Sequence, residues 1–231
     1  MARLTSVERE KYRQEGYVVP AWRLPAARVA LMRAALDRLI EANPGVRPEK
    51  LVSAHLEDGK EGVKGVRDFC KPAGDGLETP FRQDGHYWPI RPLATCTAWI
   101  ALDASTRENG CLRVIPGSHA GRKLFNHLRE DRSDVVLTQR IHDPAFDEAS
   151  AVDVELEPGQ MSLHDVYMIH GATVNRSSRR RAGVAIRYMP GTSVFERKLM
   201  PASSASGYLV DFSTRPLWLV RGQDRTGRNF I

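Results

Sequence analysis

The segment 81-FRQDGHYWP-89 places groups capable of chemistry at two-residue spacing. Alternate side chains of a β-strand point to the same face, so Arg82, Asp84 and His86 would share one face of a strand here. A carboxylate and an imidazole are potential metal ligands, whereas a guanidinium is a permanent cation without a free lone pair. We therefore expect a half-buried strand that directs polar side chains inward.

The segment 181-RAGVAIR-187 also combines two arginines with small residues between them. On a strand, Arg181 and Arg187 share one face, and the residues between them on that face are glycine and alanine. This face leaves room for an anion, and a carboxylate is a preferred partner of the arginine fork. The alternate positions are apolar, so we expect the opposite face to pack into the structure.

The helices and strands that must position these residues are expected in different parts of the chain. Residues 5–16 read as a helix with a Thr/Ser cap and a glycine stop, and residues 26–43 repeat apolar residues at spacings of three and four. After about residue 69, short β-branched and aromatic segments such as 95–102 and 182–189 alternate with Gly/Pro/Asn turns. This pattern predicts a mainly β sandwich or barrel rather than a βαβ sheet.

Composition excludes several classes of protein. The chain has 231 residues, 42% hydrophobic and 27% charged, which suits a single domain over residues 1–231 with a sizeable core. It has no apolar run of membrane-spanning length and opens with a charged segment, so we expect a cytoplasmic protein that does not contact a membrane. Cys70, Cys96 and Cys111 lack CxxC spacing and fit small hydrophobic residues better than zinc ligands.

The net charge is +6, and the densest basic run is 176-RSSRRR-181. This run has no regular aromatic interleaving and matches no DNA-binding motif, so we do not expect nucleic acid as a partner. The sequence leaves open whether the protein forms a homo- or hetero-oligomer.

Five segments carry a family resemblance: 83-QDGHYWPIRP-92, 99-WIALD-103, 108-ENGCLRVIPGSH-119, 169-IHGATVN-175 and 181-RAGVAIRYMP-190. In order and spacing, the sequence resembles the phytanoyl-CoA dioxygenase family of non-haem Fe(II)/2-oxoglutarate oxygenases. The resemblance implies a double-stranded β-helix, the cupin-like jelly-roll barrel, over residues 70–190. Residues 1–69 would form a helical support, and 191–231 a C-terminal tail.

The resemblance also implies site residues. Asp84 matches the carboxylate ligand of iron, and His170 matches the distal histidine ligand. Arg181 matches the arginine that grips the distal carboxylate of 2-oxoglutarate, while Gln83 and Trp99 match positions lining that co-substrate's pocket. The implied cofactors are Fe(II) and 2-oxoglutarate, with dioxygen and a small-molecule substrate as partners.

One departure from the family lies in the metal motif itself. The first histidine of the family pattern is replaced by Arg82, which cannot ligate iron. His86, on the expected strand face, or a water is then the candidate third ligand. We expect His164 to be a structural histidine. His119, Arg187 and Tyr87 are candidate substrate contacts, although His119 fits a loop-anchoring role equally well.

A second departure is a shortened segment. Relatives have a helix and a strand between the region matching residues 61–69 and the strand entering residues 70–72, whereas here the two are joined directly. The barrel edge and one wall of the co-substrate pocket should be altered as a result.

Two functions follow. The first is a 2-oxoglutarate-dependent dioxygenase that hydroxylates a small molecule with an atypical metal site. The alternative is a non-catalytic, metal-free relative in which Arg82 takes the metal's place beside Asp84. Such a protein would bind an anionic ligand through Arg181 or serve as a scaffold partner.

Overall fold

The computed structural model describes residues 3–51, 68–137, 139–199, 212–213 and 215–231. The helices are α1 (Ser6–Glu15), α2 (Ala26–Glu41) and α3 (Pro48–Leu51). The strands are β1 (Tyr17–Val18), β2 (Asp68–Lys71), β3 (Thr79–Gln83), β4 (Ile90–Arg91), β5 (Cys96–Ala101), β6 (Leu112–Val114), β7 (His127–Arg129), β8 (Gln139–Ile141), β9 (Val152–Val154), β10 (Met161–Asp165), β11 (Ile169–Ala172), β12 (Arg181–Tyr188) and β13 (Val194–Phe195). The mainly β composition agrees with the prediction from the sequence.

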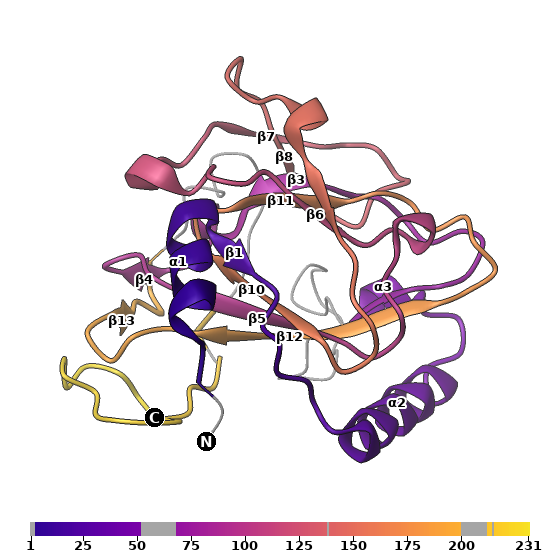
Figure 1. Cartoon of the computed structure of the whole chain (residues 1–231), viewed down its shortest axis with the longest axis horizontal. Helices are drawn as coiled ribbons and strands as arrows, with labels where there is room; N and C mark the ends of the chain where they lie inside the picture. Colours follow the sequence, from indigo (N-terminus) through magenta and orange to yellow (C-terminus); the bar gives the residue numbers. More distant parts are fainter. Residues whose placement is uncertain (1–2, 52–67, 138, 200–211, 214) are drawn as a thin grey trace.

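Two antiparallel sheets form the body of the protein. One has the order β1-β10-β5-β12-β2 and the other β3-β11-β6-β9, and Figure 1 shows them facing each other. Between them lies an apolar cluster that includes Trp99, Leu112, Val154 and Met168. This is the expected double-stranded β-helix. Two short two-stranded sheets, β4 with β13 and β7 with β8, flank it.

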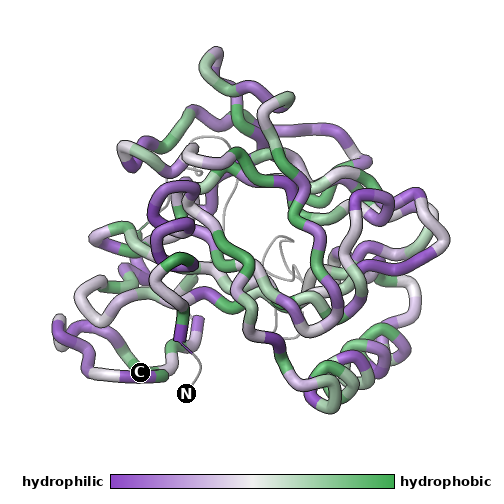
Figure 2. Tube along the Cα trace, viewed as in Figure 1, coloured by the Kyte–Doolittle hydropathy of each residue, from purple (hydrophilic) through white to green (hydrophobic). Residues whose placement is uncertain are grey.

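The N-terminal helices follow their sequence signals. Helix α1 begins after Thr5, which forms a capping box with Glu8, and the chain leaves it at Gly16 in the left-handed region (φ 80°). Figure 2 shows α1 as largely hydrophilic, whereas α2 mixes hydrophilic and hydrophobic residues. In α2, Leu36 is buried and packs with Ala182 of β12, as the apolar spacing predicted.

The apolar face of β12 is covered along only part of its length. Ala182 is fully buried in the cluster with α2, but Ile186 is 38% exposed and Tyr188 is 44% exposed. The expectation that this whole face packs into the structure is therefore wrong for its C-terminal half. The physical reason is that, among the described residues, the apolar cluster under α2 extends along β12 only as far as Val184.

The strand expected over residues 81–89 is also wrong in its second half. Strand β3 ends at Gln83, and Asp84–His86 form a 3-10 turn. The turn is fixed by a tertiary contact, because the Gly85 amide donates to the Val166 carbonyl at 2.9 Å. The alternation of side chains along the strand therefore stops before Asp84, so Asp84 and His86 do not share a strand face.

The direct junction expected near residues 69–70 lies within β2, whereas residues 52–67 before it lie outside the described residues. In the part of the chain that the structure does describe, no helix has the length and apolar character needed to cross a membrane.

Candidate metal and co-substrate site

Three buried side chains converge between the two sheets. Asp84 follows β3, His170 lies on β11 of the same sheet, and His164 lies on β10 of the facing sheet. One potential ligand atom from each lies within 4.8 Å of the others. Two imidazoles and one carboxylate are the donor set that non-haem iron uses in oxygenases. The donors present therefore fit a divalent metal ion.

His164 occupies a different position from the structural one expected. Its ring centroid lies 5.1 Å from that of His170, and only 3% of the residue is exposed. Burial, followed by the neighbouring His170, lowers the pKa of His164 well below its usual value. Its imidazole is therefore neutral near pH 7, which is the form that binds a metal. Among the described residues its Nδ1 atom has no hydrogen-bond partner.

His170 is oriented by the backbone. Its Nδ1 lies 3.0 Å from the Met168 carbonyl, which accepts a hydrogen bond when that nitrogen carries the proton. In this tautomer the lone pair of Nε2 faces Oδ1 of Asp84 at 3.5 Å. Two facing lone pairs are stabilised by a cation between them, so this geometry favours a metal ion or a proton there.

Asp84 is held by neighbours on both oxygens. Arg187 donates from Nε to Oδ2 at 3.2 Å and forms an ion pair with the same oxygen through Nη2 at 3.1 Å, and the Tyr87 hydroxyl donates to Oδ1 at 2.5 Å. Burial alone would raise the pKa of Asp84, but Arg187, then His170 and Arg82, outweigh it and hold the pKa well below 3.8. Asp84 is therefore a buried anion already compensated by arginine.

Arg82, which the family resemblance aligns with the first histidine ligand, lies beside Asp84 and His170. It is directly opposite His170 across the β3–β11 pair, and its Nε is 3.8 Å from Oδ1 of Asp84. The residue is 5% exposed, and within the described structure its Nε and Nη1 atoms have no hydrogen-bond partner. The guanidinium thus adds positive charge to the centre without making a close ion pair.

Arg181 forms a second cationic position on β12. Its guanidinium carbon lies 5.2 Å from the Trp99 ring centre, and burial lowers its pKa to about 10. A side chain at Gly183 would place Cβ 2.3 Å from the Trp99 ring, so only glycine lets the indole lie under this strand. Lys71 of β2 lies directly opposite Arg181 and donates its amine proton to the Thr173 carbonyl.

One small cavity connects these groups. Its lining includes Arg82 and His170 from one sheet and Trp99, His164 and Arg181 from the other. Its volume is about 30 Å³, the space of roughly one water molecule. The site residues are therefore brought together, but 2-oxoglutarate fits only if side chains move.

Gln83 is predicted to line the co-substrate pocket, but its side chain instead forms hydrogen bonds to the backbone of neighbouring loops. Its amide nitrogen donates to the carbonyls of Lys123 at 2.9 Å and Tyr167 at 2.7 Å, and its oxygen accepts from the Phe125 amide at 2.7 Å. The side chain is fully buried and does not contribute to the cavity lining.

Two predicted histidines lie elsewhere. His86 stacks on His127 with ring centroids 4.2 Å apart and does not belong to the cluster of three ligands. His119 places Nε2 3.0 Å from the Arg13 carbonyl, which ties its loop to the end of α1. Two residues predicted to touch substrate, Tyr87 and Arg187, are the ones that hold Asp84.

Comparison with known proteins agrees with this geometry. The profile of the family described as phytanoyl-CoA dioxygenase (PhyH) matches residues 49–183. The peroxisomal phytanoyl-CoA dioxygenase of Bos taurus is 28% identical over 170 residues, covering 66% of this chain and 50% of that protein. Phytanoyl-CoA dioxygenase of Arabidopsis thaliana is 32% identical over 111 residues, covering 48% of this chain and 38% of that protein.

A solved structure shares the fold. EvdO2 from Micromonospora carbonacea var. aurantiaca, complexed with 2-oxoglutarate, has a TM-score of 0.63 at 24% identity and covers 84% of this chain and 94% of that chain. The chain spans about half or less of the length of the curated relatives named above. With a profile match over more than half of its residues, the chain belongs to the phytanoyl-CoA dioxygenase (PhyH) family.

Proposed function

We propose that this protein is an Fe(II)- and 2-oxoglutarate-dependent dioxygenase that hydroxylates a small molecule. What supports the proposal is the convergence of Asp84, His164 and His170 between the sheets of this fold. His164 takes the role that Arg82 cannot fill. When bound, iron and 2-oxoglutarate together supply the activation of dioxygen for oxidation of a C–H bond.

The co-substrate position rests on Arg181. This guanidinium is buried, and its Nε has no hydrogen-bond partner among the described residues, so a carboxylate would satisfy it. Trp99 beneath it would fix its orientation. Burial, followed by the neighbouring Arg181, holds the pKa of Lys71 well below 10.5, which favours the uncharged amine at this end of the site.

The charges of the site should couple the binding of Fe(II) to the binding of 2-oxoglutarate. Among the described residues around this centre, three arginines (Arg82, Arg181 and Arg187) outnumber the one carboxylate, Asp84, so a dication alone enters a positive environment. Fe(II) and the 2-oxoglutarate dianion together add no net charge. We expect iron to bind much more tightly in the presence of 2-oxoglutarate. Binding also requires Arg82 and Arg187 to withdraw from Asp84.

A metal-free relative is the second candidate. The observation that favours it is the existing compensation of Asp84, with Arg187 on one oxygen and Tyr87 on the other. In that case the guanidinium of Arg82 would substitute for the metal's charge, and Arg181 would bind an anionic ligand or the protein would act as a scaffold.

Two histidine variants separate these candidates. Anaerobic Fe(II) titration of metal-stripped protein with 2-oxoglutarate, followed by calorimetry, should show metal affinity at least about tenfold lower for His164→Ala than for the parent. His86→Ala is the matched control and should bind as the parent does. Equal binding by parent and His164→Ala, or loss in His86→Ala instead, would contradict the assignment of His164.

A further inference from the structure

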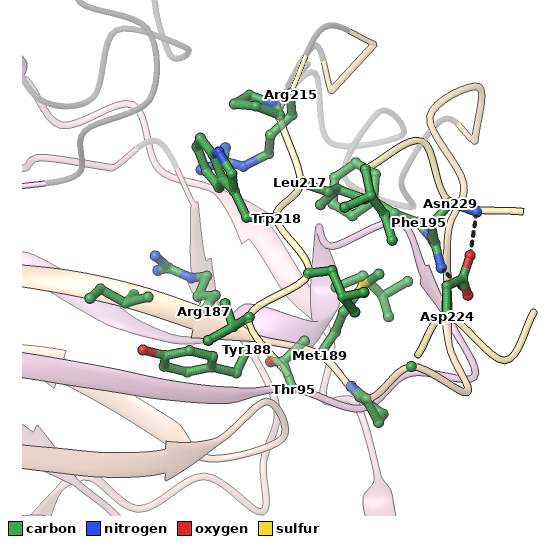
Figure 3. A pocket seen from close by; sticks show the side chains of 18 of the residues that line it. Thr95, Arg187, Tyr188, Met189, Phe195, Arg215, Leu217, Trp218, Asp224 and Asn229 are labelled. Atoms are coloured by element: carbon green, nitrogen blue, oxygen red, sulfur yellow. Dashed lines mark hydrogen bonds between the residues drawn. The ribbon is translucent and has the colours of Figure 1, made fainter. Parts of the chain in front are cut away.

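A second, larger cavity lies beside the C-terminal half of β12. Its volume is about 570 Å³, within the range of small-molecule binding pockets. Figure 3 shows Tyr188, Met189 and Thr95 on one side of it and Arg215, Leu217 and Trp218 of the C-terminal tail on the other.

Among the described residues, no helix or strand covers the end of β12 beside the pocket. Within them, strand β2 pairs with β12 from Arg181 to Val184, and the cluster under α2 ends at Val184. The tail crosses over the remaining strand, yet Ile186 is still 38% exposed and Trp218 71% exposed. The result is a hollow lined by apolar and aromatic side chains.

The charged side chains that line this pocket are mostly arginines. The Arg215 guanidinium lies 4.9 Å from the Trp88 ring centre, and that of Arg187 lies 5.3 Å from the same ring. Burial, followed by Arg187, lowers the pKa of Arg215 to about 10. The pocket's Asp224 is engaged by Thr226 and Asn229, and no carboxylate of the described residues forms an ion pair with Arg215. The guanidinium of Arg215 is therefore available to bind an anion.

The pocket adjoins the metal-site candidate at β12, where Ala185 and Arg187 belong to the linings of both cavities. Arg187 lines both cavities, and its guanidinium also holds Asp84. A molecule bound in the larger pocket therefore lies next to the residue that must move for the smaller cavity to open.

We propose that this pocket binds a small aromatic carboxylate, with its ring against Trp88, Phe195 and Trp218 and its carboxylate on Arg215. Such a compound would be the substrate class of the oxygenase, and that role rests on the proposed function. The binding itself does not, because the pocket needs no metal.

The test uses calorimetry on the full chain without iron. The probes are 1-naphthylacetate and its uncharged analogue 1-naphthylacetamide. We expect the acid to bind at one per chain and at least about tenfold more tightly than the amide. Arg215→Met should remove that preference, and Arg215→Lys should restore part of it. Arg225→Met, at an exposed arginine of the same tail outside the pocket lining, is the control and should bind as the parent does.

The proposal would be overturned by no binding of the acid at about 1 mM, by equal affinity for acid and amide, or by an equal loss in Arg225→Met. Displacement of the acid by 2-oxoglutarate would also overturn it, since that points to Arg181. Because iron is absent, failure of the metal site leaves this result standing, and failure here leaves the metal site standing.

Discussion

Replacement of Asp84 by asparagine is expected to lower the free energy of unfolding by about 3 kcal/mol and to abolish metal binding. The carboxylate is 1% exposed, and its loss leaves the buried Arg187 and Arg82 without their counter-charge. Urea denaturation at pH 7 measures the first effect and Fe(II) titration the second.

Asp153→Asn is the matched control. Asp153 also contacts two arginines, Arg107 and Arg113, but its side chain is 29% exposed. Solvent screens such pairs, so we expect a change of no more than about 1 kcal/mol. Equal destabilisation by both variants would contradict the importance of burial at Asp84.

The same carboxylate predicts a pH dependence. Since the folded protein holds the pKa of Asp84 well below 3.8, the stabilisation is complete above the unfolded pKa and is lost as the pH falls through the folded value. The stability difference between the parent and Asp84→Asn should therefore shrink on acidification below about pH 4. A difference that stays constant down to acid unfolding would show that Asp84 does not carry it.

Arg82→His is expected to tighten Fe(II) binding at least about tenfold. The change removes a cation 3.8 Å from Asp84 and places an imidazole opposite His170 on the neighbouring strand. Arg82→Met separates these effects, because it removes the charge without adding a donor. Its affinity should lie between those of the parent and Arg82→His, as measured by anaerobic calorimetry.

If a folded Arg82→His protein bound iron no better than the parent, the guanidinium would not be the obstacle. The helix and strand that are missing near residues 69–70, which the family resemblance associates with one wall of the co-substrate pocket, would then be the cause.

Local patterns predicted the elements of the fold well. The spacing of apolar residues in 26–43 gave the buried face of α2, and alternation in 181–187 gave the inward face with Arg181 and Arg187. Both patterns depend on the backbone period of one regular element, which the sequence contains.

Tertiary contacts determined what the sequence could not predict. The end of β3 depends on the contact of Gly85 with Val166, so the strand over 81–89 was expected to continue. His164 meets His170 through a facing sheet, and Arg187 reaches Asp84 across 103 positions. The one available signal for His164 was its place in a segment that also carries His170.

The most direct test of the central claim is an anaerobic titration of metal-stripped protein with Fe(II) in the presence of 2-oxoglutarate. The measured quantity is the weak visible charge-transfer band of iron chelated by 2-oxoglutarate. We predict a band that saturates at one iron per chain and is absent from Asp84→Asn. A folded parent protein that gives no band would contradict the proposed metal centre and favour the metal-free relative.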